Sequence, residues 1–291
     1  MTNMTYSDIP IAVLFFNKLN LTMRCIQSLC DAGYSKERLY VFDNGSTSDM
    51  TEILKERFTQ INTNRSIANT GFSGGFNHVL RWIFNLGFSS AFFLTNDTMA
   101  LPGLIEECRT SAVRTGAGII APCITVMNQP EKIDSIGAYV DRTTIAPQHY
   151  RSYNLGDFLD GPDDYIPGTA LWIDRNSFYA LNGADETYHT YWEDIDMCFR
   201  ARKLGIRMAR CYSARLLHGI GQTCHKKPLY TTYFFQRNRI RFCRQHLNAS
   251  EWLHAKRIIL EDLAQMKTRF QSKGDRTRLG YLEKLYAAVS E

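Results

Sequence analysis

The sequence predicts an α/β/α sandwich with a mostly parallel central sheet, followed by a C-terminal helical appendage. Short apolar runs of buried-strand length alternate with helical segments through the first 126 residues. Strands separated by helices in this way pair in parallel through right-handed crossovers. Beyond Leu247 the apolar residues follow the spacing of long helices. We therefore expect a main domain at 1–246 and a helical appendage at 247–291.

Each expected strand is a continuous apolar run, and each expected helix has apolar residues every three to four positions. In chain order the first elements are a strand at Ile9–Phe16, a helix at Leu19–Cys30, a strand at Arg38–Phe42, a helix at Asp49–Phe58, a short strand near Ile61 and a helix at Gly74–Leu86. The next are a strand at Ala91–Leu94, a helix at Leu101–Arg114, strands at Gly118–Val126 and Tyr165–Ile173, and a helix at 193–204 that ends at Gly205. In the appendage, Ser250 is the expected N-cap of a long helix.

The composition is that of an ordinary globular protein that stays in the compartment where it is made. Its 291 residues are 44% hydrophobic and 22% charged. The polar N-terminus lacks the features of a signal peptide, and no apolar run reaches the length of a bilayer span. Eight cysteines occur without a Cys-x-x-Cys spacing, which argues against a zinc knuckle or a disulfide scaffold. We expect a cytoplasmic protein with reduced thiols.

Charge is distributed unevenly along the chain. Residues 1–199 carry 14 Lys and Arg against 23 Asp and Glu, whereas residues 200–291 carry 20 against 6. The basic part would attract nucleic acid, a phosphate-bearing ligand or an anionic membrane. Because the chain has no helix-turn-helix pattern, aromatic RNA-binding signature or zinc-finger spacing, we expect no nucleic-acid partner.

Polar clusters follow three expected strands, at Asn17-Lys18, at Asp43-Asn44-Gly45-Ser46 and at Asn96-Asp97. Ligands of such sheets bind beyond the carboxyl ends of the strands. The dinucleotide-binding and P-loop motifs are both missing, which excludes those two classes. A glycine-rich turn at 69–77 either brings backbone amides close to a ribose or phosphate, or is a tight loop that needs small residues for packing.

The segment Tyr191–Arg200 crowds three carboxylates at the expected start of a helix. Glu193 and Asp194 fall in the first helical turn, where the helix dipole favours negative charge. Two explanations remain open at this point. One of the carboxylates is a catalytic base, or the segment combines N-terminal charge patterning with an ion pair on the helix face.

Taken in order, the motifs resemble the family 2 glycosyltransferases, which are inverting enzymes of the GT-A fold, especially the rhamnosyl- and galactofuranosyltransferase-like branch of bacteria. The similarity spans roughly residues 9 to 244. The matching motifs are Val41-Phe42-Asp43-Asn44-Gly45-Ser46, then Asn69, Gly71, Phe72, Gly75 and Asn77, then Leu94-Thr95-Asn96-Asp97-Thr98, then Glu193, Asp194, Asp196, Cys198 and Arg200, then His218, and finally Tyr233, Arg237 and Asn238.

This resemblance implies a nucleotide-binding half at 1–115 and an acceptor and catalytic half at 116–246. Together with the strand-end clusters, it predicts that the nucleotide-sugar donor is bound by Asn17, Asp43, Asn69, Gly71, Asn77, Asn96 and Asp97, with Asp43 accepting from the nucleobase. It implies Mg²⁺ or Mn²⁺ at Asp97 and His218, neutralising charge on the leaving diphosphate. Asp194 is implied as the general base that takes the proton of the acceptor hydroxyl.

One motif departs from the family pattern. The Asp-x-Asp of many relatives is Thr95-Asn96-Asp97 here, so we expect weak metal binding, with the phosphate-rich substrate bringing the ion. Asp97 has an alternative role as the cap of the following helix, and His218 as a buried histidine that is hydrogen-bonded in the core. The residues after it, Gly219 to Thr223, resemble a phosphate-approaching loop and favour the ligand role.

The remaining candidates belong to the acceptor side or support it. They are Gly168, Thr169, Trp192, Glu193 and Arg237. The indole of Trp192 either stacks on a sugar or packs in the core. The appendage has a basic flank, which either makes peripheral contact with the inner face of an anionic membrane or is a solvated surface. Four arginines before the appendage accompany this flank, namely Arg237, Arg239, Arg241 and Arg244.

We therefore expect an inverting glycosyltransferase. It would move a sugar such as rhamnose from a dTDP- or UDP-sugar to a saccharide or lipid-linked acceptor in the synthesis of a cell-surface polysaccharide such as O-antigen or capsule. Two alternatives are a catalytically silent nucleotide-sugar-binding partner of an assembly complex and a sugar-nucleotide pyrophosphorylase. The second should show a Gly-x-Gly-x-Arg-like turn after the first strand, which this chain lacks. The first should lack a competent base.

Overall fold

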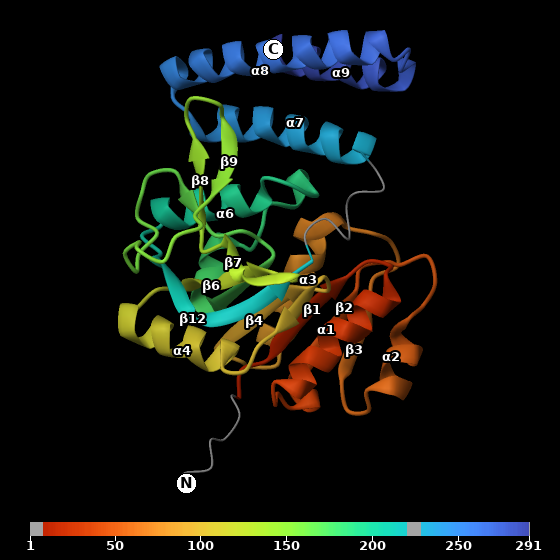
Figure 1. Ribbon diagram of the computed structural model, residues 1–291, viewed down its shortest axis with the longest axis vertical. Coiled ribbons are helices and arrows are strands. Elements are labelled where there is room, and N and C mark those ends of the chain that lie inside the picture. Colours follow the sequence, from red (N-terminus) through yellow and green to blue (C-terminus); the bar gives the residue numbers. More distant parts are fainter. Residues whose placement is uncertain (1–7, 220–227, 291) are drawn as a thin grey trace.

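In the computed structural model, which describes residues 8–219 and 228–290, a nine-stranded sheet lies between layers of helices (Figure 1). The strand order is β3-β2-β1-β4-β11-β6-β12-β5, and β7 pairs with β6 beside this path. The strands are β1 (Ile11–Phe15), β2 (Leu39–Asp43), β3 (Asn62–Arg65), β4 (Ser90–Thr95), β5 (Thr98–Ala100), β6 (Ile119–Val126), β7 (Gln129–Ser135), β11 (Ala170–Asp174) and β12 (Met208–His218).

The sheet is mostly parallel, which confirms the expected fold class. β1 pairs in parallel with β2 and β4, β2 with β3, and β6 with β12. β11 runs antiparallel between β4 and β6, and β5 runs antiparallel to β12. The first four strands therefore end at the same edge of the sheet.

Helices cover both faces because the strand side chains alternate between two cores. In β1, Ile11 and Val13 join the core with α1, α2 and α4, whereas Ala12 and Leu14 join the core with α3, α5 and α6. The helices are α1 (Leu19–Asp31), α2 (Thr51–Arg57), α3 (Gly71–Asn85), α4 (Leu104–Thr115), α5 (Arg175–Leu181), α6 (Glu193–Lys203), α7 (Pro228–His246), α8 (Ala249–Ser272) and α9 (Arg276–Ser290), with short 3₁₀ turns at Lys36–Arg38 and Glu186–Tyr188.

The expected strand at Tyr165–Ile173 is wrong as a single element. Its start belongs to β10 (Asp164–Tyr165), which pairs with β8 (Ala138–Asp141) at one edge of a small second sheet, while β9 (Ala146–His149) pairs with the other edge of β8. Its end is β11, and residues 166–169 between them are irregular. Pro167 has no N–H to give to a ladder, and the N–H of Gly168 is donated to a side chain instead.

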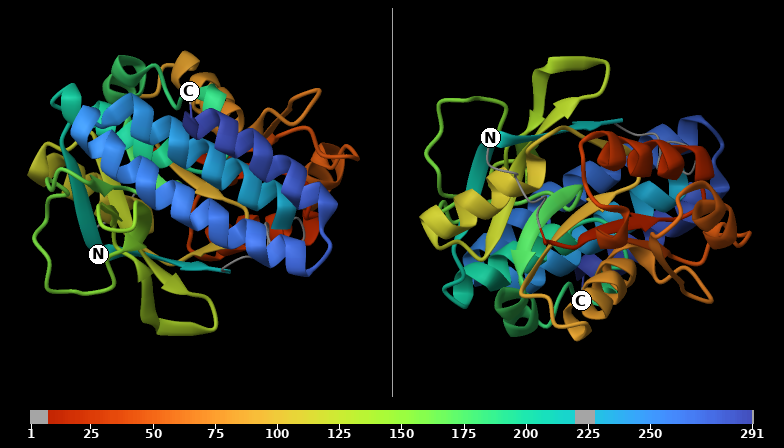
Figure 2. Two further views of the ribbon diagram at one scale, coloured as in Figure 1. Left: turned by 90° about the horizontal axis from the view of Figure 1, so that it is seen from above. Right: turned by 90° about the horizontal axis from the view of Figure 1, so that it is seen from below.

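The C-terminal helices pack over α6 and the β8–β9 hairpin, with α8 and α9 forming the outermost layer (Figures 1 and 2). Ile259 of α8 and Leu282 of α9 are buried in the same core as α3 and α6. The expected N-cap Ser250 is wrong, because Asn248 caps α8 in a capping box with Glu251. Within the described residues, no helix is both long enough and apolar enough to cross a membrane.

Candidate active site

The predicted donor residues gather at the edge where the parallel strands end. In the sheet register, Phe15 of β1 lies beside Asp43 of β2, and Leu14 lies beside Thr95 of β4. The polar clusters that begin at Asn17, Asp43 and Asn96 therefore follow neighbouring strand ends, as parallel pairing requires.

Asp97 and His218 meet at this edge, although 121 positions separate them in the chain. His218 is the last residue of β12 and pairs with Thr98 of β5. Its Nε2 lies 3.9 Å from Asp97 Oδ2, and Thr95 Oγ1 donates a hydrogen bond of 2.7 Å to Asp97 Oδ1. Asp97 does not cap the next helix, since the N-cap of α4 is Gly103.

A third residue, Asp134 of β7, completes the surroundings of His218. Its Oδ2 lies 3.1 Å from His218 Nδ1. Burial alone would lower the pKa of His218, but the hydrogen bonds and charges of Asp134 and Asp97 outweigh it and raise that pKa to about 9. The same contacts lower the pKa of Asp134 against the effect of its burial. Sequence analysis missed Asp134, because no local motif marks it.

These atoms suit a hard divalent cation that is also held by a substrate. Two metal–ligand bonds of about 2.1 Å can span a separation such as that between Asp97 Oδ2 and His218 Nε2. Across residues 8–219 and 228–290, no group of three or more His, Cys, Asp or Glu side chains is arranged to hold a metal ion. The described part of the chain would thus supply few ligands, and a diphosphate would add others. The predicted phosphate loop from Gly219 to Thr223 lies, after its first residue, outside the described residues.

The structure separates the three carboxylates at the start of α6. Asp196 is fully buried between Arg200 and His246, at 2.8 Å from each, and is thus structural. Glu193 is also buried, and among the described residues its Oε2 has no hydrogen-bond partner. Asp194 is half-buried and accepts hydrogen bonds of 2.9 Å from the backbone N–H of Gly168 and of Ile195.

The surroundings raise the pKa of both Glu193 and Asp194. Burial is the main cause for each carboxyl, and the nearby Asp194 charge adds to the shift of Glu193. The backbone N–H donors of Gly168 and Ile195 offset part of the effect on Asp194. A carboxylate with a raised pKa is a better proton acceptor than an ordinary surface aspartate.

A short hydrogen-bonded path joins the two acids. Thr95 donates to the carbonyl of Thr169 from its N–H (3.0 Å) and from its hydroxyl (3.3 Å), and the same hydroxyl contacts Asp97. The residue before Thr169 is Gly168, whose N–H is bound to Asp194. Asp97 and Asp194 therefore flank one segment, 168–169, where β11 enters the sheet beside β4.

The loop before Asp194 has a strained backbone. His189, Tyr191 and Trp192 all have positive φ values, of 64°, 66° and 72°, which non-glycine residues rarely adopt. The side-chain amide of Asn238 in α7 donates to the carbonyls of Tyr188, Thr190 and Tyr191, at 2.7, 2.7 and 2.8 Å. These bonds hold the loop in the conformation that leads into α6.

The contacts of Arg237 and Trp192 are with other parts of the protein. One Arg237 nitrogen, Nη2, donates to the carbonyls of Thr187 and Tyr188 at 2.8 and 2.9 Å, so Arg237 supports the same loop as Asn238. Trp192 is 2% exposed, and its ring packs against those of Phe235 and Phe242. Its indole is therefore part of the core, and its face is not open to a sugar.

The glycine-rich turn opens α3 beside this loop. Gly71 has a φ of 75°, and a Cβ there would lie 2.3 Å from the His189 ring. Asn69 Oδ1 accepts a hydrogen bond of 2.7 Å from the Gly71 N–H. The turn therefore needs glycine for both its backbone conformation and its packing.

Four other predicted donor residues already have protein partners. Asn77 exchanges hydrogen bonds of 2.8 Å with the backbone of Ala184. The Asn96 amide donates to Thr22. Asn17 Oδ1 accepts from Thr47, and the fully buried Asp43 accepts from the Ser46 N–H and lies 3.2 Å from Arg65 Nε. The side-chain amide of Asn77 and the amide nitrogen of Asn96 are thus engaged within the protein, and contact of these residues with a donor stays a prediction.

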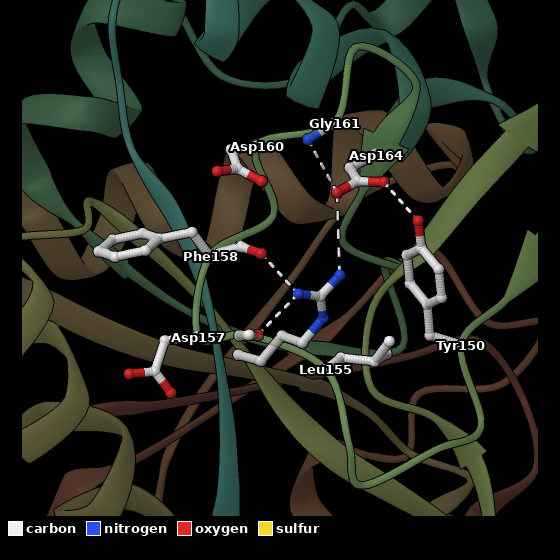
Figure 3. A pocket seen from close by; sticks show the side chains of 9 residues that line it. Tyr150, Leu155, Asp157, Phe158, Asp160, Gly161 and Asp164 are labelled. Atoms are coloured by element: carbon white, nitrogen blue, oxygen red, sulfur yellow. Dashed lines mark hydrogen bonds and ion pairs between the residues drawn. The ribbon is translucent and has the colours of Figure 1, made fainter.

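A separate pocket of about 360 Å³ lies at the other end of β12 (Figure 3). Its lining residues are Tyr150, Leu155, Gly156, Asp157, Phe158, Asp160, Gly161, Asp164 and Arg210. The Arg210 guanidinium donates to the carbonyls of Gly156 and Ile136, at 2.8 and 3.1 Å, and contacts the carbonyl of Phe158. Because the N–H groups of Arg210 are donated to these carbonyls, Arg210 holds the surrounding loop in place. None of the residues that line this pocket belongs to the strand-end site with Asp97 and Asp194.

The sequence is similar to those of known proteins. A family model described as "Glycosyl transferase family 2" matches residues 11–178. A low-salt glycan biosynthesis hexosyltransferase of Haloferax volcanii is 27% identical over 208 residues, covering 68% of this chain and 64% of its own length. An N-acetylglucosaminyl-diphospho-decaprenol L-rhamnosyltransferase of Mycobacterium tuberculosis is 22% identical over 242 residues, covering 76% of this chain and 78% of its own length.

Solved structures share the fold. A mannosyltransferase of Pyrobaculum calidifontis, in complex with GDP-Man and Mn²⁺, aligns with a TM-score of 0.60 at 11% identity, over 99% of this chain and 87% of its own. The enzyme GalNAc-T7 with UDP, GalNAc and Mn²⁺ aligns with a TM-score of 0.63 at 11% identity, over 99% of this chain and 58% of its own. At these identities the likeness shows the GT-A fold alone.

Proposed function

Because this chain belongs to glycosyl transferase family 2 and is therefore a glycosyltransferase, we propose that it transfers a hexosyl group from a nucleoside-diphosphate sugar. The proposed acceptor is a hydroxyl of a saccharide or of a lipid-linked saccharide, and the configuration of the anomeric carbon is inverted. A dTDP- or UDP-sugar is the proposed donor, with rhamnose as the leading sugar. The names of the two relatives, a hexosyltransferase and a rhamnosyltransferase, support this choice.

One observation carries the proposal. The segment 168–169 contacts Asp194 through the Gly168 N–H and Thr95 through the Thr169 carbonyl, and Thr95 contacts Asp97. Two acids with different tasks thus lie on either side of a short stretch of backbone. A donor diphosphate at Asp97 and an acceptor hydroxyl at Asp194 would then approach each other there.

In this proposal Asp97 and His218 hold Mg²⁺ or Mn²⁺ together with the donor diphosphate. When bound, the cation neutralises the negative charge that develops on the leaving nucleoside diphosphate. Thr95 fixes the Asp97 carboxylate through its hydroxyl. The carboxylate thereby keeps one oxygen, Oδ2, directed at His218.

Asp194 acts as the general base. It takes the proton of the acceptor hydroxyl while that oxygen forms a bond to the anomeric carbon. The bond from this carbon to the diphosphate oxygen breaks on the opposite side, and its electron pair leaves with the nucleoside diphosphate. Gly168 and Ile195 orient the carboxylate through their backbone N–H groups, and its raised pKa favours proton transfer.

We also propose that the enzyme works at the cytoplasmic face of a membrane, in the assembly of a cell-surface polysaccharide such as O-antigen or capsule. Of the four arginines named above, Arg239 is buried and paired with Asp262 at 2.7 Å, and Arg237 binds backbone carbonyls. Arg241 and Arg244 are exposed and stay candidates for the contact. Exposed basic residues of α8, α9 and their connection are further candidates, namely Arg257, Lys267, Arg269, Lys273, Arg276 and Lys284.

The test of the function is release of nucleoside diphosphate from a panel of sugar nucleotides, with and without Mn²⁺ and with saccharide and lipid-linked acceptors. A transferase releases the diphosphate in an acceptor-dependent way and forms a product of inverted configuration. In a further assay with pyrophosphate added, acceptor-independent formation of a nucleoside triphosphate and a sugar 1-phosphate would indicate a pyrophosphorylase, and no turnover under any of these conditions would indicate a silent binding partner. Co-sedimentation with neutral and with anionic vesicles tests the membrane contact, which fails if the two give equal binding.

A further inference from the structure

His218 presents its two ring nitrogens to two different carboxylates. Nε2 faces Asp97 Oδ2 at 3.9 Å, and Nδ1 faces Asp134 Oδ2 at 3.1 Å. The His218 and Asp134 side chains are each 16% exposed, so the contact is shielded from most of the solvent. When one ring nitrogen of a histidine is bound by a carboxylate, the other nitrogen is the one that can bind a ligand.

The direction of the hydrogen bond follows from the chemistry of its partners. An ionised carboxylate only accepts hydrogen bonds, so Nδ1 is the donor to Asp134. Nε2 is then the nitrogen left on the side of Asp97. A histidine that binds a metal ion commonly donates its other N–H to a carboxylate, which sets both the tautomer and the orientation of the ring.

The sheet brings Asp134 to this position by a local irregularity. β7 and β12 pair with opposite edges of β6, and His218 lies beside Val126 at the end of that strand. The β6–β7 register shifts between the Ile124, Thr125 and Val126 pairs, next to Asp134. Such a bulge can redirect a side chain out of the regular alternation. Ile133 and Ser135, on either side of Asp134, are buried.

We propose that Asp134 is a positioning residue that orients His218 for a divalent cation held between His218 and Asp97. The inference rests on the metal site of the proposed function and adds to it a residue that does not itself touch the cation. Asp134 holds the ring through Nδ1, so that Nε2 keeps its direction toward Asp97. Within residues 8–219 and 228–290, Asp97 is the one acidic ligand proposed for this site, so the direction of the imidazole matters more for the affinity.

The test measures binding of Mn²⁺ alone to the purified full-length chain by the electron paramagnetic resonance signal of the unbound ion. Asp134→Ala should raise the dissociation constant for Mn²⁺ by about 10- to 100-fold, the range for loss of an outer partner of a metal ligand. Asp134→Asn keeps an oxygen that accepts from Nδ1 and should recover most of the affinity. Glu131→Ala is the matched control, because it removes an equal charge from an exposed position of the same strand and should leave the affinity unchanged.

Electron spin echo modulation then separates positioning from direct ligation. Bound Mn²⁺ should show coupling to ¹⁴N that is lost in His218→Ala and weakened in Asp134→Ala. Undiminished ¹⁴N coupling in Asp134→Ala, or an Asp134→Asn affinity as low as that of the alanine variant, would mean that Asp134 is itself a ligand and would overturn the proposal. A lower melting temperature with unchanged affinity would assign Asp134 a purely structural role and would equally overturn it.

The same measurements distinguish this inference from the proposed function. If His218→Ala weakens Mn²⁺ binding and Asp134→Ala does not, the positioning role alone is refuted. If the unmodified chain binds no Mn²⁺ either alone or together with a nucleoside diphosphate, or if neither Asp97→Ala nor His218→Ala changes the binding, then the metal site of the proposed function fails and the positioning role fails with it. Acceptor-dependent release of nucleoside diphosphate is measured independently of both.

Discussion

The backbone N–H of Gly168 donates a hydrogen bond of 2.9 Å to Asp194 Oδ2. This contact attaches the carboxylate at the start of α6 to the segment through which the chain enters β11. A Cβ at position 168 would lie 2.9 Å from the Phe72 ring, so a larger residue cannot take the place of glycine without movement. The proposed base is thus positioned by backbone that has little freedom to shift.

Asp194→Asn should lower turnover by about 100- to 10,000-fold, the usual contribution of a general base. The amide is close to the carboxylate in size but cannot accept the hydroxyl proton. Donor binding should stay near its original value, and the melting temperature should fall modestly, because one of the N–H donors, that of Gly168 or that of Ile195, loses its acceptor. Turnover is measured as nucleoside-diphosphate release, with the exposed Asp160→Asn as the control. Near-normal turnover in Asp194→Asn would remove Asp194 from the role of base.

Asp97→Ala should weaken metal-dependent binding of the donor by at least about tenfold, the lower end for disturbing a metal ligand. The measurement is the rise in melting temperature caused by a nucleoside diphosphate, with and without Mn²⁺. The Mn²⁺-dependent part of that rise should disappear in the variant, while any part seen without Mn²⁺ remains. An unchanged response to Mn²⁺ would contradict the assignment of Asp97.

Gly168→Ala should lower turnover by about 10- to 100-fold, because small displacements of reacting groups are costly. The added methyl group would push against Phe72 and move the N–H that orients Asp194. Overpacking of this kind destabilises by about 1–3 kcal/mol. Gly156→Ala is the control, since a Cβ at Gly156 meets nothing within 4 Å. Equal activity of the two variants would show that the Gly168 contact is dispensable.

Asn238→Ala should reduce the free energy of unfolding by about 2 kcal/mol, at about 1 kcal/mol for each of the two N–H groups that its side-chain amide donates. The bonds restrain Tyr191 and the neighbouring residues of the positive-φ loop, so turnover should also fall as the start of α6 loosens. Urea unfolding measures the first effect and diphosphate release the second. Asn154→Ala, at an exposed position, should change neither. A stable and fully active Asn238→Ala would refute the restraint.

Glu193→Gln should stabilise the protein increasingly as pH rises above the ordinary range of carboxyl groups. Burial, with the Asp194 charge, raises the folded-state pKa of Glu193 above its unfolded value. The stability that this carboxyl contributes is therefore complete below the unfolded pKa and is lost as pH rises through the folded pKa. Glutamine cannot ionise and avoids that loss. Urea unfolding of Glu193→Gln and of the unmodified protein from about pH 4 to pH 8 tests this, with Glu131→Gln as the control. A difference in the free energy of unfolding that does not depend on pH would refute the explanation by a buried acid.

Much of the fold and the outline of the site could be predicted because the decisive signals are local. The apolar strand runs and the polar residues that follow them identify the edge with Asp43 and Asp97 before any contact is known. The apolar spacing of residues 195–204 likewise predicts that Asp194 lies in the first turn of a helix. The meeting of Asp97 with His218 came from the resemblance to a family, and the structure confirms that the two side chains lie together.

The rest depends on pairings between distant segments that no local pattern encodes. The sequence predicts that the amides of Asn77 and Asn96 bind a ligand, whereas in the structure these amides donate hydrogen bonds to Ala184 and Thr22. Asp134 stands 84 positions from His218, and its approach depends on an irregular register between β6 and β7. The break between β10 and β11, by contrast, has a local signal, because the dipeptide Pro167-Gly168 interrupts the apolar run and is typical of turns.

The burial of Ile259, Leu263 and Leu285 in the same core as α6 limits how this enzyme can be shortened. A chain that stopped at Leu247 would leave the apolar surface beneath these helices facing water. That surface lies beside Phe242, whose ring packs against Trp192, two residues before the proposed base Asp194. Trimming the tail to obtain a minimal catalyst should therefore yield aggregation instead of a smaller active protein.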